Sequence, residues 1–190
     1  NVNKITISAT TKAILNNSIL TIEDATIKGS DTIKNNTGGT LELTDTNVTS
    51  TNLAIENLGG LTVNSSSISG TNYAIYHNSN GTVTVKNTTL KSSNGHSVYN
   101  NNNGLITLED TDSTGSIRNN NANGTLNILD SAEEKGLLQP SVTITNNGEL
   151  NISDISITQT TAANVINNTK TLNVTNSTIT GLGGYAVSNK

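Results

Sequence analysis

The sequence lacks Phe, Trp, Cys and Met, and its aromatic residues are four tyrosines. A core built around large rings is therefore excluded, and buried side chains must be mainly Ile, Leu, Val and Ala. Disulfides and thiolate metal sites are excluded too. No apolar run approaches the roughly 18 residues that a membrane-spanning helix needs, and we expect no direct insertion into a membrane.

Charge is also scarce, because charged residues make up 13% of the chain and the formal net charge is −4. The single arginine, Arg118, cannot form the basic stripe that neutralises a phosphate backbone. Nucleic acid is therefore not an expected partner. Asn and Thr are the commonest residues, a bias typical of disorder unless apolar residues recur in a regular pattern.

Such a pattern exists, since a triplet of the form apolar-x-apolar returns every 20 to 24 residues. Alternation with period two predicts a short strand with one buried face. The triplets are Leu20–Ile22, Leu41–Leu43, Leu61–Val63, Val83–Val85, Ile106–Leu108, Leu126–Ile128, Leu150–Ile152 and Leu172–Val174.

Two further motifs complete each repeat. Five residues after the triplet comes a second apolar position, occupied by Ile27, Val48, Ile68, Leu90, Ile157 and Ile179 and broken by Ser113 and Glu133. The repeat then closes on a small-apolar-x-Asn motif, centred on Ile14, Ile33, Ile55, Ile75, Val98, Ile117, Ile144, Val165 and Val187. Two residues beyond each centre stands Asn16, Asn35, Asn57, His77, Asn100, Asn119, Asn146, Asn167 or Asn189. We number the coils one to nine by these centres.

Three short strands per repeat, with no helical period between them, predict an all-β fold, a single-stranded parallel β-helix of about nine coils of ~22 residues. Right-handed winding follows from the usual chirality of parallel crossovers. A β-sandwich is the alternative, and the strict repetition of three different motifs argues against it. Glycines before the next triplet, at Gly39, Gly60, Gly81, Gly104, Gly124 and Gly148, predict turns with positive φ.

Residues 1–190 form one repeat domain under this interpretation, and residues 131–140, which hold the only proline, form a loop insertion. Equivalent asparagines of successive coils should stack into an amide ladder, since each side chain carries both donors and acceptors. We expect His77 to cap its neighbours' amides there, with ligand binding as the alternative.

Residues 61–70, LTVNSSSISG, followed by residues 73–78, YAIYHN, resemble the pectate lyase-like adhesive domains of Firmicutes surface proteins. They are also similar to the adhesin-like β-helix repeats of gut methanogens. The resemblance covers nearly the whole chain. It implies a module of a larger protein that is secreted and held at the cell surface or cell wall, where the β-helix is a stalk or an adhesive surface. We expect flanking domains in the parent chain.

A candidate ligand-binding surface lies on coils four and five, with Glu56 and Arg118 at equivalent outward positions on the flanking coils. Tyr76 and Tyr99 follow the buried centres Ile75 and Val98, so they should project outward one above the other. The full candidate set is Tyr73, Tyr76, His77, His96, Tyr99 and Arg118. Tyrosine combines apolar area with a hydroxyl group, which suits a glycan or a protein partner from a host or a microbial surface. Stacking that only stabilises adjacent coils is the alternative.

A candidate calcium site, the only cofactor considered, comprises Asp110, Asp130 and Asp154, which follow successive triplets by two residues. Stacked carboxylates repel one another unless a cation or backbone amides compensate. The alternative is that each aspartate caps its own turn. No catalytic constellation is recognisable, so we expect no enzyme activity; a polysaccharide-active β-helix, lyase-like or hydrolase-like, is the alternative function.

Overall fold

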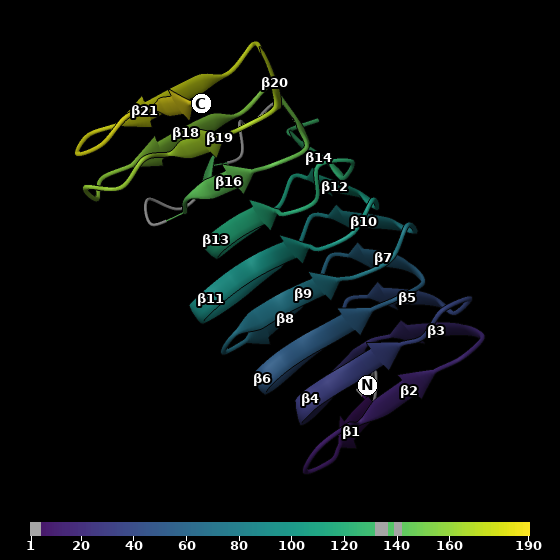
Figure 1. The fold of residues 1–190 in the computed structure, drawn as a ribbon. Helices are drawn as coiled ribbons and strands as arrows, with labels where there is room; N and C mark the ends of the chain where they lie inside the picture. Colours follow the sequence, from purple (N-terminus) through teal and green to yellow (C-terminus); the bar gives the residue numbers. More distant parts are fainter. Residues whose placement is uncertain (1–4, 132–136, 139–141) are drawn as a thin grey trace.

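The computed structural model describes residues 5–131, 137–138 and 142–190. They form a parallel β-solenoid of about eight turns whose coils stack in sequence order, with the two ends of the chain at opposite ends of the stack (Figure 1). Every strand pairing within the described residues is parallel. The prediction of an all-β parallel solenoid is therefore confirmed, and these residues contain no helix long and apolar enough to span a membrane.

The triplets form one sheet of eight strands, one strand per coil. Leu41 pairs with Leu20 and Leu61, and the same register continues to Leu172, so the outer two residues of each triplet stack on their counterparts. The strands are β3 (Ile19–Glu23), β5 (Thr40–Thr44), β7 (Gly60–Asn64), β10 (Thr82–Lys86), β12 (Leu105–Glu109), β14 (Thr125–Leu129), β17 (Glu149–Ser153) and β20 (Thr171–Thr175).

The second and third motifs share a larger sheet, because the long strands β4, β6 and β11 carry both motifs and turn a corner between them. Val98 pairs with Ile75 and Ile117, as the spacing predicts. The strands are β1 (Ile5–Ser8), β2 (Ile14–Asn16), β4 (Ala25–Asn35), β6 (Asn47–Asn57), β8 (Ser67–Gly70), β9 (Tyr73–His77), β11 (Thr89–Asn100), β13 (Asp112–Asn119), β16 (Ile144–Asn146), β19 (Ile166–Asn168) and β22 (Val187–Asn189).

Near the C-terminal end the second motif forms a sheet of its own, from β15 (Leu137–Leu138), β18 (Ser156–Gln159) and β21 (Thr178–Gly181). Leu138 pairs with Ile157, which pairs with Ile179. Two residues of the expected loop insertion thus form a strand of the solenoid. Residues 132–136 and 139–140 of that insertion, Glu133 included, lie outside the described residues.

The core is one continuous column of aliphatic side chains, with Ile27, Ile55 and Leu41 among the fully buried ones. Ser113 breaks the second apolar position as expected, and it is buried against the Ser97 hydroxyl, with which it hydrogen-bonds. This pair fills the corner of coil six, which turns sharply through Gly115 at a φ of 100°.

The register of coil eight corrects one prediction. Ile166, rather than Val165, pairs with Ile144, and Asn168, rather than Asn167, pairs with Asn146. The segment carries two apolar residues followed by two asparagines, so the motif fits in two ways, and only the pairing of β19 with its neighbours distinguishes them.

The glycines before each triplet also have a different role from the predicted one. Positive φ occurs instead two residues after the triplet, at Asp24, Asp45, Ser65, Asn87, Asp110, Asp154 and Asn176, with values from 47° to 59°. Short polar side chains tolerate that left-handed conformation. Among glycines, the described residues have positive φ only at Gly38 and Gly115.

Five of the six predicted glycines stack in one column, and in coil three Gly59 takes this place instead of Gly60. A Cβ on Gly124 would lie 2.6 Å from the Asn119 Oδ1 atom, and one on Gly81 would lie 2.6 Å from the Gly59 carbonyl oxygen. Glycine is therefore required by the close approach of a neighbouring backbone and of the buried asparagines.

Candidate functional site

The predicted aromatic surface forms where three neighbouring coils present outward side chains from β9, β11 and β13. Tyr99 pairs with Tyr76 on one side and with Arg118 on the other, while His96 pairs with Tyr73. Parallel in-register stacking at about 4.8 Å per coil therefore brings these residues into contact. We call Tyr73, Tyr76, His96, Tyr99 and Arg118 the tyrosine patch.

The rings of the tyrosine patch contact one another in two rows. Tyr76 and Tyr99 are stacked, with ring centroids 5.5 Å apart and an interplanar angle of 18°. Tyr73 meets both of them edge-on at 5.4 and 5.7 Å. His96 lies 5.1 Å from the Tyr99 ring and 5.9 Å from Tyr73. The result is a half-buried, continuous aromatic surface on an otherwise Asn-, Ser- and Thr-rich rod.

Charge is placed at the two ends of the tyrosine patch. The Arg118 guanidinium carbon lies 5.8 Å from the centroid of the Tyr99 ring, within the range of a cation–π contact. Its Nε donates to Asn120 Oδ1 at 3.0 Å. At the opposite end, Glu56 pairs with Lys34 at 2.9 Å. Among the described residues Arg118 forms no salt bridge, so its remaining donors face solvent or a ligand.

Two groups of the patch have pKa values shifted in the direction that favours their neutral forms. Burial, followed by the neighbouring Tyr99, Tyr73 and Glu56, raises the pKa of the Tyr76 hydroxyl. Burial and then the Arg118 charge lower the pKa of His96, whose Nδ1 lies in hydrogen-bond contact with the Ser116 hydroxyl. Arg118 is therefore the only cation of the patch at neutral pH.

His77 does not belong to the tyrosine patch, although the sequence placed it among the candidates. Its side chain is fully buried and occupies one position of the inner ladder. We define the inner ladder as the column of Asn16, Asn35, Asn57, His77, Asn100, Asn119, Asn146, Asn168 and Asn189, all buried except the terminal Asn189. The reason is the strand alternation, which points residue 76 outward and residue 77 inward.

Six asparagines of the inner ladder donate Nδ2 to the Oδ1 of the next coil, for example Asn35 to Asn57 at 2.7 Å and Asn119 to Asn146 at 2.8 Å. Many of them also donate to a backbone carbonyl of the adjoining turn, as Asn146 does to Gly148 at 2.9 Å. One carboxamide thus holds both its own turn and the next coil.

His77 breaks this chain of hydrogen bonds. Asn57 Nδ2 lies 2.9 Å from His77 Nδ1, and His77 Nε2 lies 3.1 Å from the Gly81 carbonyl oxygen. Nδ1 must accept and Nε2 must donate, which fixes a neutral imidazole with its proton on Nε2. No donor is left for the next coil, and Asn100 Oδ1 is buried without a hydrogen bond.

The three aspartates of the candidate calcium site do not form one cluster, although Asp110 and Asp130 interact. The described residues contain no group of three His, Cys, Asp or Glu side chains able to hold a metal ion. Asp110 accepts from the backbone and hydroxyl of Ser131 at 2.8 and 2.6 Å, in the next coil. Burial raises its pKa, but the bonds from Ser131 and Asp130 and the charge of Lys86 outweigh burial and lower it. Protein groups therefore compensate the carboxylate.

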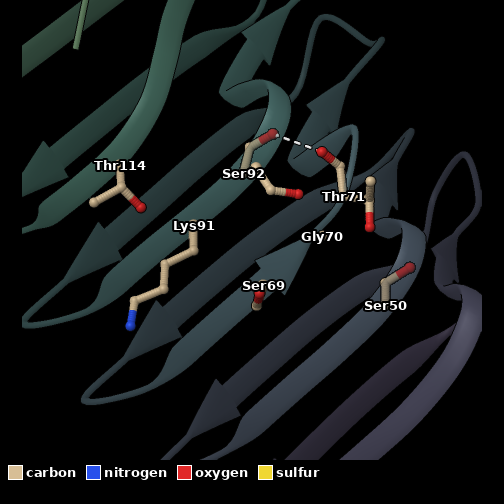
Figure 2. A pocket seen from close by; sticks show the side chains of 8 residues that line it. Ser50, Ser69, Gly70, Thr71, Lys91, Ser92 and Thr114 are labelled. Carbon is tan, nitrogen blue, oxygen red and sulfur yellow. Dashed lines mark hydrogen bonds between the residues drawn. The ribbon is translucent and has the colours of Figure 1, made fainter. Parts of the chain in front are cut away.

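A shallow pocket of about 270 Å³ lies outside β6, β8 and β11, on the other side of the corner from the tyrosine patch (Figure 2). Its wall is rich in hydroxyl groups, and the Ser92 hydroxyl donates to the Thr71 carbonyl at 3.1 Å. Lys91 extends away from Ser92 and Thr71 along the face. Because Ser92 bonds to the backbone of the corner, we interpret the hydroxyl groups of this pocket as part of the fold and not as a binding site.

A second hollow, of about 620 Å³, was not predicted from the sequence. It lies at the turns between the large sheet and the triplet sheet, where Leu58, Gly59 and Gly60 form a short turn between two longer ones. The sequence does contain a signal for this hollow in the lengths of its turns. Three residues separate Asn57 from Leu61, whereas five separate Asn35 from Leu41 and His77 from Val83. We call this hollow the turn slot.

Comparison of the chain with protein-family models, with curated proteins and with solved structures found no match.

Proposed function

We propose that this β-solenoid is a non-catalytic module of a secreted cell-surface protein and that its tyrosine patch binds a surface glycan. One observation carries the proposal: three tyrosines and a histidine form a continuous outward aromatic surface with an arginine at its edge. Sugar rings stack their C–H faces on such rings, while tyrosine hydroxyls and a guanidinium bond their hydroxyl groups. The resemblance to adhesive β-helix repeats agrees with this assignment.

A glycan-array screen of the soluble module tests the proposal. The wild type should bind a subset of glycans with or without calcium, and the Tyr76→Ala/Tyr99→Ala variant should lose that binding. The matched control is Thr84→Ala/Thr107→Ala, which changes a stacked outward pair on the triplet sheet. Absence of glycan binding by the wild type would reject the proposal and favour a spacer or a protein partner.

A polysaccharide-active enzyme is the second candidate, and one cluster favours it. Lys86 Nζ pairs with Glu109 at 2.7 Å, and Asp110 interacts with both Lys86 and Asp130. A pair of carboxyl groups is the equipment of glycoside hydrolysis. Incubation with acidic and neutral polysaccharides would decide, because release of reducing ends that Asp110→Asn abolishes would replace the binding proposal with catalysis.

A further inference from the structure

The turn slot follows from the lengths of three successive turns. The turns after coils two and four each have five residues, and the turn after coil three has three. The longer turns stand on either side of the short one, whose Gly59 and Gly60 add no side chain. The lining residues are Thr37, Gly38, Gly39, Thr40, Leu58, Gly59, Gly60, Asn78, Ser79, Asn80, Gly81 and Asn102. None of them is charged.

An outer ladder of amide side chains runs beside the inner one and is interrupted at this slot. We define it as Asn17, Asn36, Asn78, Asn101 and Asn120, with Leu58 in the place of coil three. Asn36 Nδ2 donates to Asn17 Oδ1 at 2.7 Å, and Asn101 Nδ2 donates to Asn78 Oδ1 at 3.1 Å. Asn36, Asn101 and Asn120 thus each donate to the coil before them.

Leu58 therefore leaves one donor and one acceptor without their ladder partner. Asn78 Nδ2 would donate to a carboxamide oxygen at position 58, and Asn36 Oδ1 would accept from its nitrogen. Within the described part of the chain neither atom has a hydrogen bond. The two side chains belong to coils two spacings apart, about 10 Å, with the half-buried Leu58 side chain on the coil between them. Asn78 lines the slot, and Asn36 directly precedes the lining residue Thr37.

We propose that the turn slot binds the acetamido group of an N-acetylated amino sugar, which takes the place of the missing carboxamide. The acetamido carbonyl accepts from Asn78 Nδ2, and its N–H donates to Asn36 Oδ1. In a trans amide these two groups point in opposite directions, which is the direction of the ladder. The methyl group packs on Leu58, where a polar residue would offer no apolar contact.

The remaining lining of the slot favours a sugar over a charged ligand. Ser79, Asn80, Thr37 and Asn102 offer neutral donors and acceptors for ring hydroxyls. No residue of the tyrosine patch lines the slot, so this proposal does not depend on the proposed function. An extended peptide, whose backbone amide has similar polarity, is the competing occupant.

Titration of the ¹⁵N-labelled protein with N,N′-diacetylchitobiose, followed by NMR, tests the proposal. Cellobiose is the matched probe, since it has hydroxyl groups where the first sugar has acetamido groups. We expect chitobiose to shift the side-chain amide signals of Asn78 and Asn36, and cellobiose to bind at least tenfold more weakly. Equal binding of the two sugars, or no binding of chitobiose, would overturn the proposal, and binding of only an uncharged peptide would assign the slot to that occupant instead.

Two variants locate the binding. Leu58→Asn supplies the missing carboxamide and should weaken chitobiose binding at least tenfold while it preserves the fold. Gly60→Gln places a side chain in the slot without a clash, because the nearest atom to its Cβ is Thr40 Oγ1 at 3.9 Å; it should have the same effect. Leu105→Gln, an exposed position of the same turn column two coils away, should bind like the wild type, as should Tyr76→Ala/Tyr99→Ala. Wild-type affinity in both slot variants would refute the assignment.

Discussion

The inner and outer ladders use the same side chain, one residue apart in each coil, in two different environments. In the inner ladder every asparagine from coil two to coil eight is buried and bonded to both backbone and neighbour, and the break at His77 leaves a buried acceptor, Asn100 Oδ1, without a donor. In the outer ladder the break at Leu58 leaves groups that water reaches. A missing amide therefore costs stability inside the rod and creates a binding opportunity outside it.

The largest expected effect comes from removal of one inner asparagine. Asn146 accepts from Asn119 and donates to Asn168, to Gly148 and to the Thr171 carbonyl. Asn146→Ala leaves several of these groups buried and unpaired, and we expect the free energy of unfolding to fall by about 3 kcal/mol. Urea unfolding followed by far-UV circular dichroism measures it.

The control for this change is the next residue in the sequence. Asn147 points outward and bonds at 3.1 Å with the Thr169 hydroxyl, and Asn147→Ala should change the free energy of unfolding by less than about 0.5 kcal/mol. Equal effects of the two substitutions would mean that burial does not determine how much an asparagine contributes to the free energy of unfolding.

The second prediction concerns the glycines that make room for the inner ladder. A Cβ at Gly148 would lie 2.7 Å from Asn119 Nδ2 and close to two backbone carbonyls, whereas a Cβ at Gly60 meets open space. Gly148→Ala should therefore destabilise the protein by about 2 kcal/mol, and Gly60→Ala should be nearly neutral. Thermal melts of the two variants compare them, and a similar loss at Gly60 would point to backbone conformation rather than to steric contact.

Repair of the inner break should stabilise the protein. In His77→Asn the new carboxamide has two Nδ2 protons, one for the Gly81 carbonyl and one for Asn100 Oδ1, whereas the neutral imidazole has a single N–H. We expect a gain of about 1 kcal/mol in the free energy of unfolding, measured in urea at pH 8. A loss of stability would show that the imidazole packs better than the hydrogen-bond pattern indicates.

The same substitution should change how stability depends on pH. Burial lowers the pKa of His77 in the folded state below its usual value near 6.5, and the hydrogen bonds at Gly81 and Asn57 offset only part of this effect. The unfolded chain then binds more protons, so stability is complete above about pH 6.5 and falls as the pH drops from there toward the folded-state pKa. His77→Asn should remove this part of the loss, while His96, whose pKa is also lowered, keeps its own share.

The sequence predicts most of this architecture because period-two alternation and a repeat near 22 residues act on every coil alike. The strand register follows from this repeat, and the register brings Tyr76, Tyr99 and Arg118 together. The sequence could not separate Asn167 from Asn168, since each satisfies the motif. Nor could it assign the glycines to steric contact, because the atoms that require them belong to the coil below and to the buried amides.

The place of His77 in the inner ladder was predicted, but the turn slot and the missing hydrogen bond from His77 to Asn100 were not, for a related physical reason. Both depend on what is missing from a stack, a carboxamide at Leu58 and a second N–H at His77. A repeat pattern shows which residues are alike in every coil, and a single different residue looks like ordinary sequence variation between the coils. Its consequence appears only when the donors and acceptors of the two neighbouring coils are followed atom by atom.

Leu58→Asn, which repairs the break in the outer ladder, should change the free energy of unfolding least of these substitutions. It compares directly with His77→Asn in the inner ladder. Leu58→Asn adds the same carboxamide to a ladder as His77→Asn, but its neighbours Asn36 and Asn78 already exchange hydrogen bonds with water, so the net gain is small. It also removes a half-buried leucine contact, and we expect the free energy of unfolding to change by less than about 0.5 kcal/mol. Urea unfolding of both variants and of the double variant measures this. If Leu58→Asn stabilised the protein as much as His77→Asn, the value of a ladder amide would come from the stack itself and not from its burial.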